Sequence, residues 1–410
     1  MIVKILPCRP TGVVRAPASK SFAHRLLIAA ALSKTTSTLT IADTSADIEA
    51  TARCLRALGV AVTQNGDKWT VEPPKMWNRS VTLDCGESGS TLRFLLPVAA
   101  AMGVDAVFTG QGKLPERPND VLLSAMKAHG VFVGGGFPIH IHGQLLPGEY
   151  TLRGDISSQF ATGLLFALSG LDAPSTLTLT PPVSSEAYLA MTVDVLRQFG
   201  ADITQTENTY TIRPAALYGS TYTAEGDWSN GAARLACGFS VGSLRPDSLQ
   251  GDRAFLQILQ DAGAKVLQED GAIRLDLSDL HFPVIDADPI PDLVPVLAAL
   301  AATANGETHI RNAARLRLKE SDRLSSTEAL LLSLGADIRQ TDDGLLIRGK
   351  PALSGGRAAC ANDHRIVMAA AVAAQKSLSP VVIEDAQAID KSFPTFFKLY
   401  NAHGGSAYVL

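Results

Sequence analysis

The sequence predicts an α/β (α+β) fold of six repeated units sorted into two domains, and three observations lead to this prediction. The chain has 410 residues, well above the usual domain length of about 100 to 150 residues. A helix-like segment followed by a glycine and a short alternating segment recurs about every 70 residues. A second, almost wholly apolar segment recurs at the same interval.

The repeating glycine follows an amphipathic segment in each unit. Apolar residues lie three and four apart there, as at Leu189, Val193 and Leu196, which places them on one stripe of a helix. A glycine directly after a helix suits a left-handed cap, and two strands with a polar turn follow it, as in 201–214 and 264–276. The six glycines are Gly59, Gly130, Gly200, Gly263, Gly335 and Gly404.

The other recurring segment predicts a second helix that precedes the amphipathic one in every unit. It is apolar nearly all round, which is typical of a helix buried inside a domain. The expected helices begin near Lys20, Ser90, Ser158, Ser229, Asp292 and Asp363.

Composition excludes several classes of protein. The net charge of −4 argues against nucleic-acid binding by bulk positive charge. The five cysteines form no C-x-x-C pair, so we expect neither a disulfide framework nor a structural zinc site, and a reducing cytoplasm fits. The longest apolar stretch, 94–104, is shorter than the roughly 20 residues of a membrane span, and we see no secretory signal at the start.

Polar residues gather at the N-termini of the expected buried helices. Such an N-terminus offers free backbone N–H groups and partial positive charge, which together favour a bound anion. Serine, aspartate and asparagine there are also ordinary helix caps. Capping does not explain the cations in these first turns, because the helix dipole disfavours positive charge there. An anion bound beside the cations would explain them. These cations are Lys20, Arg25, Arg93 and Arg365.

Three further clusters carry charge outside the helix starts. Arg117 precedes a proline in an expected loop, and Lys391 lies just ahead of an expected helix. In the run 315–323, an extended backbone would put Arg315, Arg317 and Lys319 on one strand face, with Glu320, Asp322 and Arg323 following where a helix begins. A solvated face or an ion-pair ladder is the alternative for this run. His140 and His142 share a strand face, but without a third ligand nearby a solvated strand is the better interpretation.

Ten short segments, in order along essentially the whole chain, resemble the EPSP synthase family of enolpyruvyl transferases. They are ASKSFAHR, GESGSTLR, ERP, SSQF, EGD, SLQGD, IPD, RLKESDRL, NDHR and DKSFP. The resemblance implies two domains, each of three βαβαββ units, with the active site in the cleft between them. One domain would combine 1–18 with 227–410, and the other would span 19–226.

The resemblance also implies the reaction. The enolpyruvyl group of phosphoenolpyruvate would pass to the 5-hydroxyl of shikimate 3-phosphate, releasing phosphate, by addition and elimination through a tetrahedral ketal. This step belongs to chorismate and aromatic amino acid biosynthesis and uses no metal or organic cofactor. The expected partners are the two small-molecule substrates, with no nucleic acid and no membrane, and the expected state is a cytoplasmic monomer.

Site residues carried over from the family fall into three sets. The catalytic set is Asp292, Glu320, Lys20 and Lys391, with Asp292 at the hydroxyl and Glu320 at the methylene proton. The phosphoenolpyruvate set is Lys20, Gly89, Arg117, Gln159, Arg323, Arg365 and Lys391. The shikimate 3-phosphate set is Lys20, Ser21, Arg25, Ser157, Ser158, Gln159, Ser185, Asp292 and Lys319. Because Gly89 lacks a side chain, it would leave room for a ligand, and we expect inhibition by glyphosate.

The sequence departs from the family pattern at Glu87 and Arg315, where asparagines are common, and the roles of both stay open. Two rival functions remain. The sister enzyme that acts on a UDP-amino sugar typically carries a cysteine in the loop corresponding to 110–118, and this chain has none there. A non-catalytic clamp on nucleic acid would require a steep salt dependence of binding.

Overall fold

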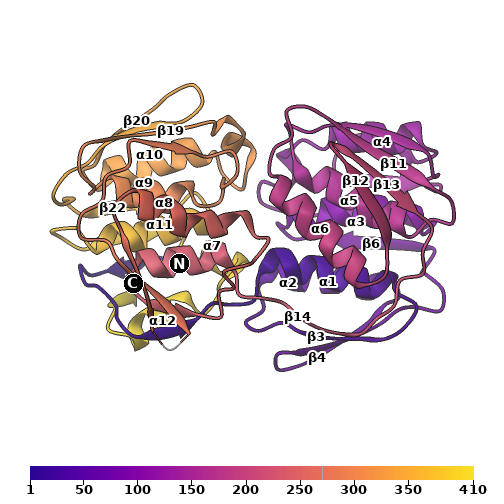
Figure 1. Cartoon of the computed structure of the whole chain (residues 1–410), viewed down its shortest axis with the longest axis horizontal. Helices are drawn as coiled ribbons and strands as arrows, with labels where there is room; N and C mark the ends of the chain where they lie inside the picture. The colour runs from indigo at the N-terminus through magenta and orange to yellow at the C-terminus, as the bar shows by residue number, and fades with distance from the viewer. Residues whose placement is uncertain (270) are drawn as a thin grey trace. The chain divides into compact units, whose positions relative to one another are not determined.

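The computed structural model of the chain describes residues 1–269 and 271–410. The chain divides into two compact units. Unit 1 consists of Met1–Pro17 and Glu225–Leu410, and unit 2 consists of Ala18–Ala224. In Figure 1 the colour runs from indigo to magenta through unit 2, while unit 1 contains both chain termini.

The described part of the chain holds six four-stranded sheets that share one strand order. In one of them, β10 (Glu149–Arg153) pairs parallel with β11 (Ser175–Thr180). Strand β13 (Thr209–Arg213) then lies antiparallel between β11 and β12 (Asp202–Thr206). In four of the six sheets the first strand in chain order pairs with the second and the second with the fourth, and in the other two a strand from a distant part of the chain takes one of these places, which confirms the repeated βαβαββ unit.

The other sheets repeat this order, the first strand of each standing first here. Unit 2 adds β14 (Thr221–Thr223), β3 (Ser37–Thr40), β5 (Lys68–Glu72) and β4 (Ala61–Asn65), and β6 (Ser80–Asp84), β7 (Asp105–Thr109), β9 (Ile139–His142) and β8 (Phe132–Val133). Unit 1 holds β2 (Val13–Arg15), β15 (Ser240–Gly242), β17 (Ala272–Asp276) and β16 (Lys265–Glu269); β18 (Val284–Asp286), β19 (Glu307–Arg311), β21 (Leu345–Arg348) and β20 (Asp337–Gln340); and β22 (Gly356–Ala359), β23 (Val381–Glu384), β1 (Val3–Ile5) and β24 (Ala407–Val409).

Strands distant in sequence complete three of these sheets. β1 lies between β23 and β24, and β2 pairs parallel with β15, so the first residues of the chain are built into unit 1. In unit 2, β14 comes from the last residues of the unit and pairs parallel with β3, which comes from its first residues. The chain therefore leaves unit 1 after Pro17 and returns to it at Glu225.

The apolar helices form the centre of each unit, as the sequence predicts. In unit 1, α7 (Trp228–Ala236), α9 (Val294–Ala301) and α11 (His364–Ala374) pack against one another. In unit 2, α3 (Gly89–Ala101) packs against α5 (Ser158–Ser169), and α1 (Lys20–Leu32) joins the same hydrophobic core. Almost every residue of these helices is buried, so only their ends can offer chemistry to a ligand.

Amphipathic helices cover this centre, with one face buried and the other exposed. They are α2 (Ala46–Ala57), α4 (Asp120–Ala128), α6 (Glu186–Gln198), α8 (Ala254–Asp261), α10 (Arg323–Ser333) and α12 (Phe396–Ala402). The six repeating glycines that follow them all have positive φ, between 83° and 103°. This conformation confirms the left-handed caps, since residues with a Cβ rarely adopt it.

One local expectation is not met. The segment from Ala314 to Leu318 is a 3-10 helix rather than an extended strand, so Arg315, Arg317 and Lys319 do not share a strand face. Two ion pairs hold the turn, Arg315 with Asp288 from an earlier part of the chain and Arg317 with Asp322 just after the turn. Lys391 ends a second 3-10 helix, Ala386–Lys391, five residues before α12 begins.

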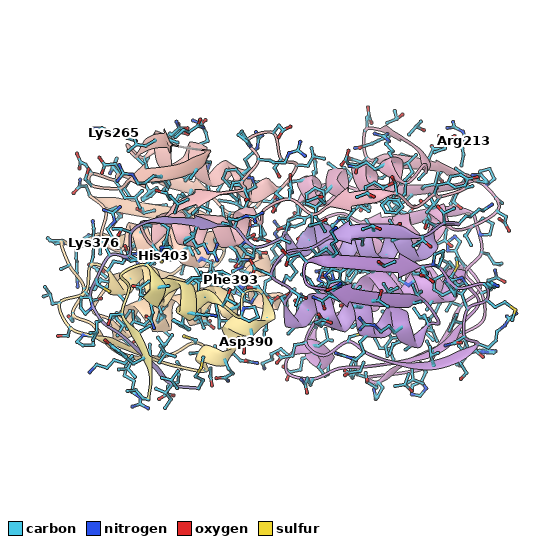
Figure 2. All side chains as sticks on the ribbon, turned by 90° about the horizontal axis from the view of Figure 1, so that it is seen from below. Arg213, Lys265, Lys376, Asp390, Phe393 and His403 are labelled. Carbon is cyan, nitrogen blue, oxygen red and sulfur yellow. The ribbon has the colours of Figure 1, made fainter. Side chains whose placement is uncertain are left out.

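Three further features concern the sequence-based exclusions. No helix in the residues described here is both long and apolar enough to cross a membrane. All five cysteines are free thiols. His140 and His142 are exposed on β9, where His142 pairs with Asp105 at 2.7 Å, and the described residues contain no cluster of three metal-binding side chains. Phe393, which is labelled in Figure 2, is buried in unit 1, and the guanidinium of Arg234 lies 3.9 Å from the centre of its ring.

Candidate active site

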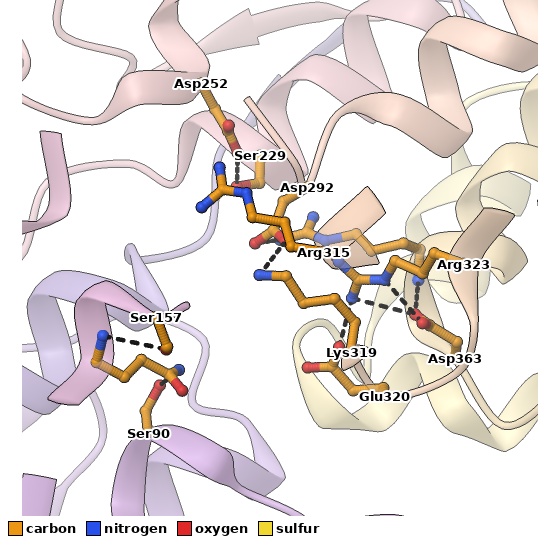
Figure 3. A network of polar contacts seen from close by, with 12 residues as sticks. Ser90, Ser157, Ser229, Asp252, Asp292, Arg315, Lys319, Glu320, Arg323 and Asp363 are labelled. Carbon is orange, nitrogen blue, oxygen red and sulfur yellow. Dashed lines mark hydrogen bonds and ion pairs between the residues drawn. The ribbon is translucent and has the colours of Figure 1, made fainter. Parts of the chain in front are cut away.

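In unit 1, one arginine holds three carboxylates together. Arg323 is the first residue of α10, and its side chain is 1% exposed. Its Nε donates to Asp363 Oδ2 at 2.8 Å. Its Nη1 donates to Asp292 Oδ1 and its Nη2 to Glu320 Oε2, both at 2.7 Å (Figure 3). The structure thus places the two carboxylates predicted to be catalytic on neighbouring nitrogens of one guanidinium.

Asp292 lies just before α9 and is surrounded by cations. Lys319 Nζ is 3.7 Å from its Oδ1, and Arg365 Nη2 is 3.6 Å from its Oδ2. Burial alone would raise the pKa of Asp292, but Lys319, Arg323 and Arg365 together hold it well below its usual value. The carboxylate is therefore ionised in the free protein and can accept a hydrogen bond from a hydroxyl.

Lys319 is the second titrating group of this cluster. Burial lowers the pKa of its ammonium to about 8, and the attraction of Asp292 offsets only part of that effect. Its charge therefore depends on pH just above neutrality.

Asp363 fixes the other side of Arg323. Its carboxylate is completely buried, caps α11 by accepting from the Arg365 backbone N–H at 2.9 Å, and accepts from Ser321 Oγ at 3.1 Å. One residue earlier, the carbonyl of Asn362 accepts from Lys391 Nζ at 2.6 Å. The N-terminus of α11 therefore gathers Arg365, Arg323 and Lys391 through its capping turn.

A further carboxylate, Asp252, joins this cluster although it was absent from the predicted site. It accepts a hydrogen bond from Ser229 Oγ (Figure 3). Burial, and then the charge of Asp292, raise the pKa of Asp252 to about 7. The signal in the sequence was only the QGD segment, which does not reveal burial.

In unit 2, Lys20 is the first residue of α1 and pairs with Asp47 of α2, Nζ to Oδ2 at 2.9 Å. Both side chains are partly exposed, at 16% and 12%. Asp47, like Asp252, was missed, because its position in the first turn of a helix reads as an ordinary favourable dipole contact. Lys20 thus lies at a helix N-terminus with its ammonium already held.

Arg25 is buried one turn further along α1 and is satisfied by neutral oxygens. Its Nε donates to Thr192 Oγ1 at 2.9 Å, and its two Nη groups donate to the carbonyls of Ser21 at 2.8 Å and Tyr188 at 3.0 Å. Burial lowers the pKa of this guanidinium to about 10. From the sequence, we expected a bound anion to explain this cation. The structure shows that oxygen atoms of the protein also accept hydrogen bonds from it.

Gln159 and the serines before it form the start of α5. Ser157 caps the helix by accepting from the Gln159 backbone N–H at 3.3 Å, and Ser158 is its first residue. The Gln159 side chain donates from Nε2 to Ser90 Oγ at 2.9 Å and accepts from Arg93 Nη1 at 2.7 Å. Ser185 precedes α6 with φ of 57°, a left-handed conformation.

Gly89 and Arg117 meet at the start of α3. A Cβ built on Gly89 would lie 2.5 Å from Arg117 Nη1, so glycine leaves room for the guanidinium. The sequence led us to expect that this room would serve a ligand directly, and the structure fills it with Arg117 instead. Arg117 Nε is buried without a hydrogen-bond partner among the described residues.

The two units therefore gather two separate sets of the predicted residues. Unit 1 brings together Asp292, Lys319, Glu320, Arg323, Arg365 and Lys391. Unit 2 holds Lys20, Ser21, Arg25, Gly89, Arg117, Ser157, Ser158, Gln159 and Ser185, mostly at the starts of α1, α3, α5 and α6.

Comparison with known proteins fits both the fold and these residue sets. The family model described as EPSP synthase (3-phosphoshikimate 1-carboxyvinyltransferase) matches residues 7–399. The chain belongs to the EPSP synthase family. It is 40% identical to a 3-phosphoshikimate 1-carboxyvinyltransferase of Clostridium kluyveri, with 98% of this chain and 97% of that one covered. A similar enzyme of Clostridium novyi is 37% identical over the same shares.

Solved structures agree with this family membership. An EPSP synthase from Acinetobacter baumannii superimposes with a TM-score of 0.81 at 25% sequence identity, and all of both chains is covered. As a member of the EPSP synthase family, the chain is an enzyme that transfers the enolpyruvyl group of phosphoenolpyruvate to shikimate 3-phosphate, in the shikimate pathway. The resemblance deduced from the ten sequence segments is thereby confirmed.

Proposed function

We propose that the two residue sets described above bind one pair of substrates and together carry out the enolpyruvyl transfer. The observation that supports this most is the set of cations at helix N-termini in both units. Each substrate has a phosphate and a carboxylate, so four anionic groups need positive partners. Helix N-termini add partial positive charge and free N–H groups to those cations.

Phosphoenolpyruvate is assigned to Lys20, Gly89, Arg117, Gln159, Arg323, Arg365 and Lys391. Arginine suits this substrate because its planar fork donates two parallel hydrogen bonds to a carboxylate or phosphate. Arg117 suits this role because it is only half-buried and the Nε of its guanidinium is without a hydrogen-bond partner among the described residues. Gly89 contributes by leaving the space in which that guanidinium lies.

Arg323 must exchange a partner to bind a substrate carboxylate in this way. A guanidinium has five N–H donors, and its contacts with Asp292, Glu320 and Asp363 use four of them. A bidentate contact therefore requires that one carboxylate turn away. Glu320 is the candidate, because Asp363 is completely buried and Asp292 is held from three sides. Glu320 released in this way can then move a proton.

Shikimate 3-phosphate is assigned to Lys20, Ser21, Arg25, Ser157, Ser158, Gln159, Ser185, Asp292 and Lys319. Asp292 suits the 5-hydroxyl because its ionised oxygens accept a hydrogen bond, as its lowered pKa requires. Lys319 lies beside it with a charge that can offset the substrate. The serines supply short, neutral donors for phosphate oxygens.

The chemistry needs one group at the hydroxyl and one at the enol methylene. In the addition, Asp292 takes the hydroxyl proton while Glu320 gives a proton to the methylene, and the hydroxyl oxygen bonds to the enol carbon. In the elimination the two groups exchange roles. Glu320 takes a proton back from the methyl group of the ketal, the carbon–oxygen bond to phosphate breaks, and Asp292 gives up the proton that it took from the hydroxyl. Lys20 and Lys391 offset the negative charge of the departing phosphate.

Glyphosate inhibition follows from the proposed phosphoenolpyruvate site. The inhibitor carries a phosphonate and a carboxylate, so it presents anions to the same arginines. A dose series at fixed phosphoenolpyruvate should show loss of activity at micromolar concentrations. Full activity at millimolar glyphosate would contradict this expectation.

We also propose that the enzyme acts as a monomer in the cytoplasm, without a metal ion. Five free thiols suit a reducing compartment. Sedimentation of the full chain should give one species near 43.2 kDa, and activity should survive a chelator. A species of twice that mass, or loss of activity with the chelator, would contradict the proposal.

Phosphate release tests the proposed function. It should require both substrates together, and neither alone should release phosphate at a comparable rate. Asp292→Ala should abolish release in a protein that still unfolds cooperatively. Its melting temperature should fall, because Lys319, Arg323 and Arg365 lose a partner. Release from phosphoenolpyruvate alone, or an unaffected Asp292→Ala variant, would contradict the assignment.

A further inference from the structure

Arg93 is a buried cation of unit 2 that none of the proposed residue sets includes. It lies on the first turns of α3, is 4% exposed, and has its guanidinium 5.0 Å from the centre of the Phe160 ring. Its Nε donates to Asn119 Oδ1 at 3.0 Å, and its Nη2 donates to the carbonyl of Pro118 at 2.9 Å. The remaining terminal nitrogen, Nη1, donates to Gln159 Oε1 at 2.7 Å.

This last contact decides which end of the Gln159 amide faces Arg93. A guanidinium has donors and no acceptor, so only the oxygen of the amide can face it. The Nε2 group of Gln159 must then point the other way, where it donates to Ser90 Oγ at 2.9 Å. An amide nitrogen carries two hydrogens, and this bond uses one of them.

The same guanidinium fixes the loop that carries Arg117. The carbonyl of Pro118 is bonded directly, and Asn119, held by Arg93 Nε, donates from Nδ2 to the carbonyl of Arg117 at 3.0 Å. Arg93 therefore connects the start of α5 with the Arg117 loop. Both carry residues assigned to phosphoenolpyruvate.

We propose that Arg93 is a positioning residue that locks the Gln159 amide so that this side chain presents N–H donors, and never its oxygen, to the substrates. The inference rests on the proposed role of Gln159 in substrate binding. The physical reason for this orientation is that both substrates are anions, and an amide oxygen turned toward them would repel them. A free amide samples both orientations, and the contact with Arg93 removes the wrong one.

A double-mutant cycle tests this inference in the full-length enzyme. Arg93→Gln and Arg93→Lys are made alone and together with Gln159→Ala, and KM for each substrate and kcat are measured. Arg93→Gln should raise KM about tenfold, because a glutamine can accept as well as donate and lets the Gln159 amide turn over. Arg93→Lys, which offers donors only, should raise KM about threefold.

The decisive comparison is the Gln159→Ala background. There the same change should raise KM clearly less than it does in the parent, because the amide that Arg93 orients is gone and only its contacts with the Arg117 loop remain. An equal rise of KM in both backgrounds would overturn the inference and show a merely structural role. If Arg93→Gln does not fold, the same cycle is measured with Arg93→Lys, for which the expected rise of KM is smaller.

Two controls separate this inference from the proposed function beneath it. If Gln159→Ala alone leaves both KM values unchanged in an active enzyme, the assignment of Gln159 fails, and this inference fails with it. If Gln159→Ala raises KM but the cycle is additive, only the inference fails. Arg213→Gln is the matched control, since Arg213 is an exposed arginine of the same unit that pairs with Asp202 at 3.4 Å (Figure 2), and it should change KM by less than about twofold.

Discussion

The charge state and the hydrogen bonds of individual side chains in this enzyme depend on their neighbours more than on their residue type. Lys319 and Lys20 are both lysines that we propose to bind substrate anions, yet burial lowers the pKa of Lys319 to about 8, while Lys20 is held by Asp47. Arg25 and Arg93 looked alike in the sequence, as cations that need an anion. In the structure neutral oxygens bond to Arg25, and Arg93 donates to the amide oxygen of Gln159.

The lowered pKa of Lys319 predicts a pH dependence of substrate affinity. Lys319 is protonated below pH 8 and loses its charge above it, so the phosphate of the bound substrate loses a cation as pH rises. KM for shikimate 3-phosphate should therefore stay level up to about pH 7.5 and then rise, by up to about tenfold per pH unit. Initial rates at saturating phosphoenolpyruvate measure this.

Lys319→Arg is the matched control for this prediction. A guanidinium stays protonated throughout the accessible range, so KM of this variant should remain level across the same interval. A rise of equal size in Lys319→Arg would show that another group causes the pH dependence.

At the scale of elements, polar and charged side chains of the proposed site stand at helix starts. Lys20, Arg323 and Ser158 are each the first residue of a helix, and the residue before each one caps that helix by accepting backbone N–H bonds. The periodicity of the sequence located these starts to within about two residues, because buried and half-buried helices need different apolar patterns. It could not show the conformation of 314–318, where ion pairs with Asp288 and Asp322 stabilise a 3-10 turn.

Removing the cap of α10 should cost both stability and activity. Asp322 accepts from the backbone N–H groups of Leu324 and Ser325 and pairs with Arg317. Asp322→Ala should lower the free energy of unfolding by about 1 kcal/mol, the usual cost of losing an N-cap. It should also lower kcat/KM, because the first turn of α10 positions Arg323. Urea unfolding and steady-state kinetics measure the two effects.

Asp322→Asn provides the comparison for this cap. Asparagine caps helices about as well as aspartate, so most of the stability should return even though the ion pair with Arg317 is lost. Equal stability of the alanine variant and the parent would contradict the proposed importance of the cap.

At the scale of the whole molecule, the six units share one strand order, but not every unit is built from one continuous stretch of the chain. Three of the six sheets consist of strands that follow one another along the chain, and each of the other three includes a strand from a distant part of it. The local sequence reveals the repeat, but it gives no signal that β1 and β2 complete sheets formed by residues after 225, since such pairing depends on contacts distant in sequence. The resemblance to a known family supplied that part of the organisation.

Deleting residues 1–17 should therefore unfold unit 1 and spare unit 2. Without β1, strands β23 and β24 lose their shared neighbour, and without β2 the sheet of β15 loses its parallel partner. Unit 2, residues 18–224, keeps all the strands of its three sheets. Hydrogen exchange followed by mass spectrometry should show full exchange in 225–410 and protection in 18–224. Protection of β23 in the truncated chain would contradict this view of the fold.

We propose that Asp292 and Glu320 move protons between the substrates, and isotope incorporation in D2O is the decisive experiment. If Glu320 delivers a solvent-derived proton to the enol methylene and the ketal then loses one, the product of a single turnover must carry deuterium in its enolpyruvyl methylene. Glu320→Gln should slow that incorporation together with product formation, by more than about a hundredfold. Product formed at full rate without deuterium, or unchanged incorporation in Glu320→Gln, would contradict the mechanism.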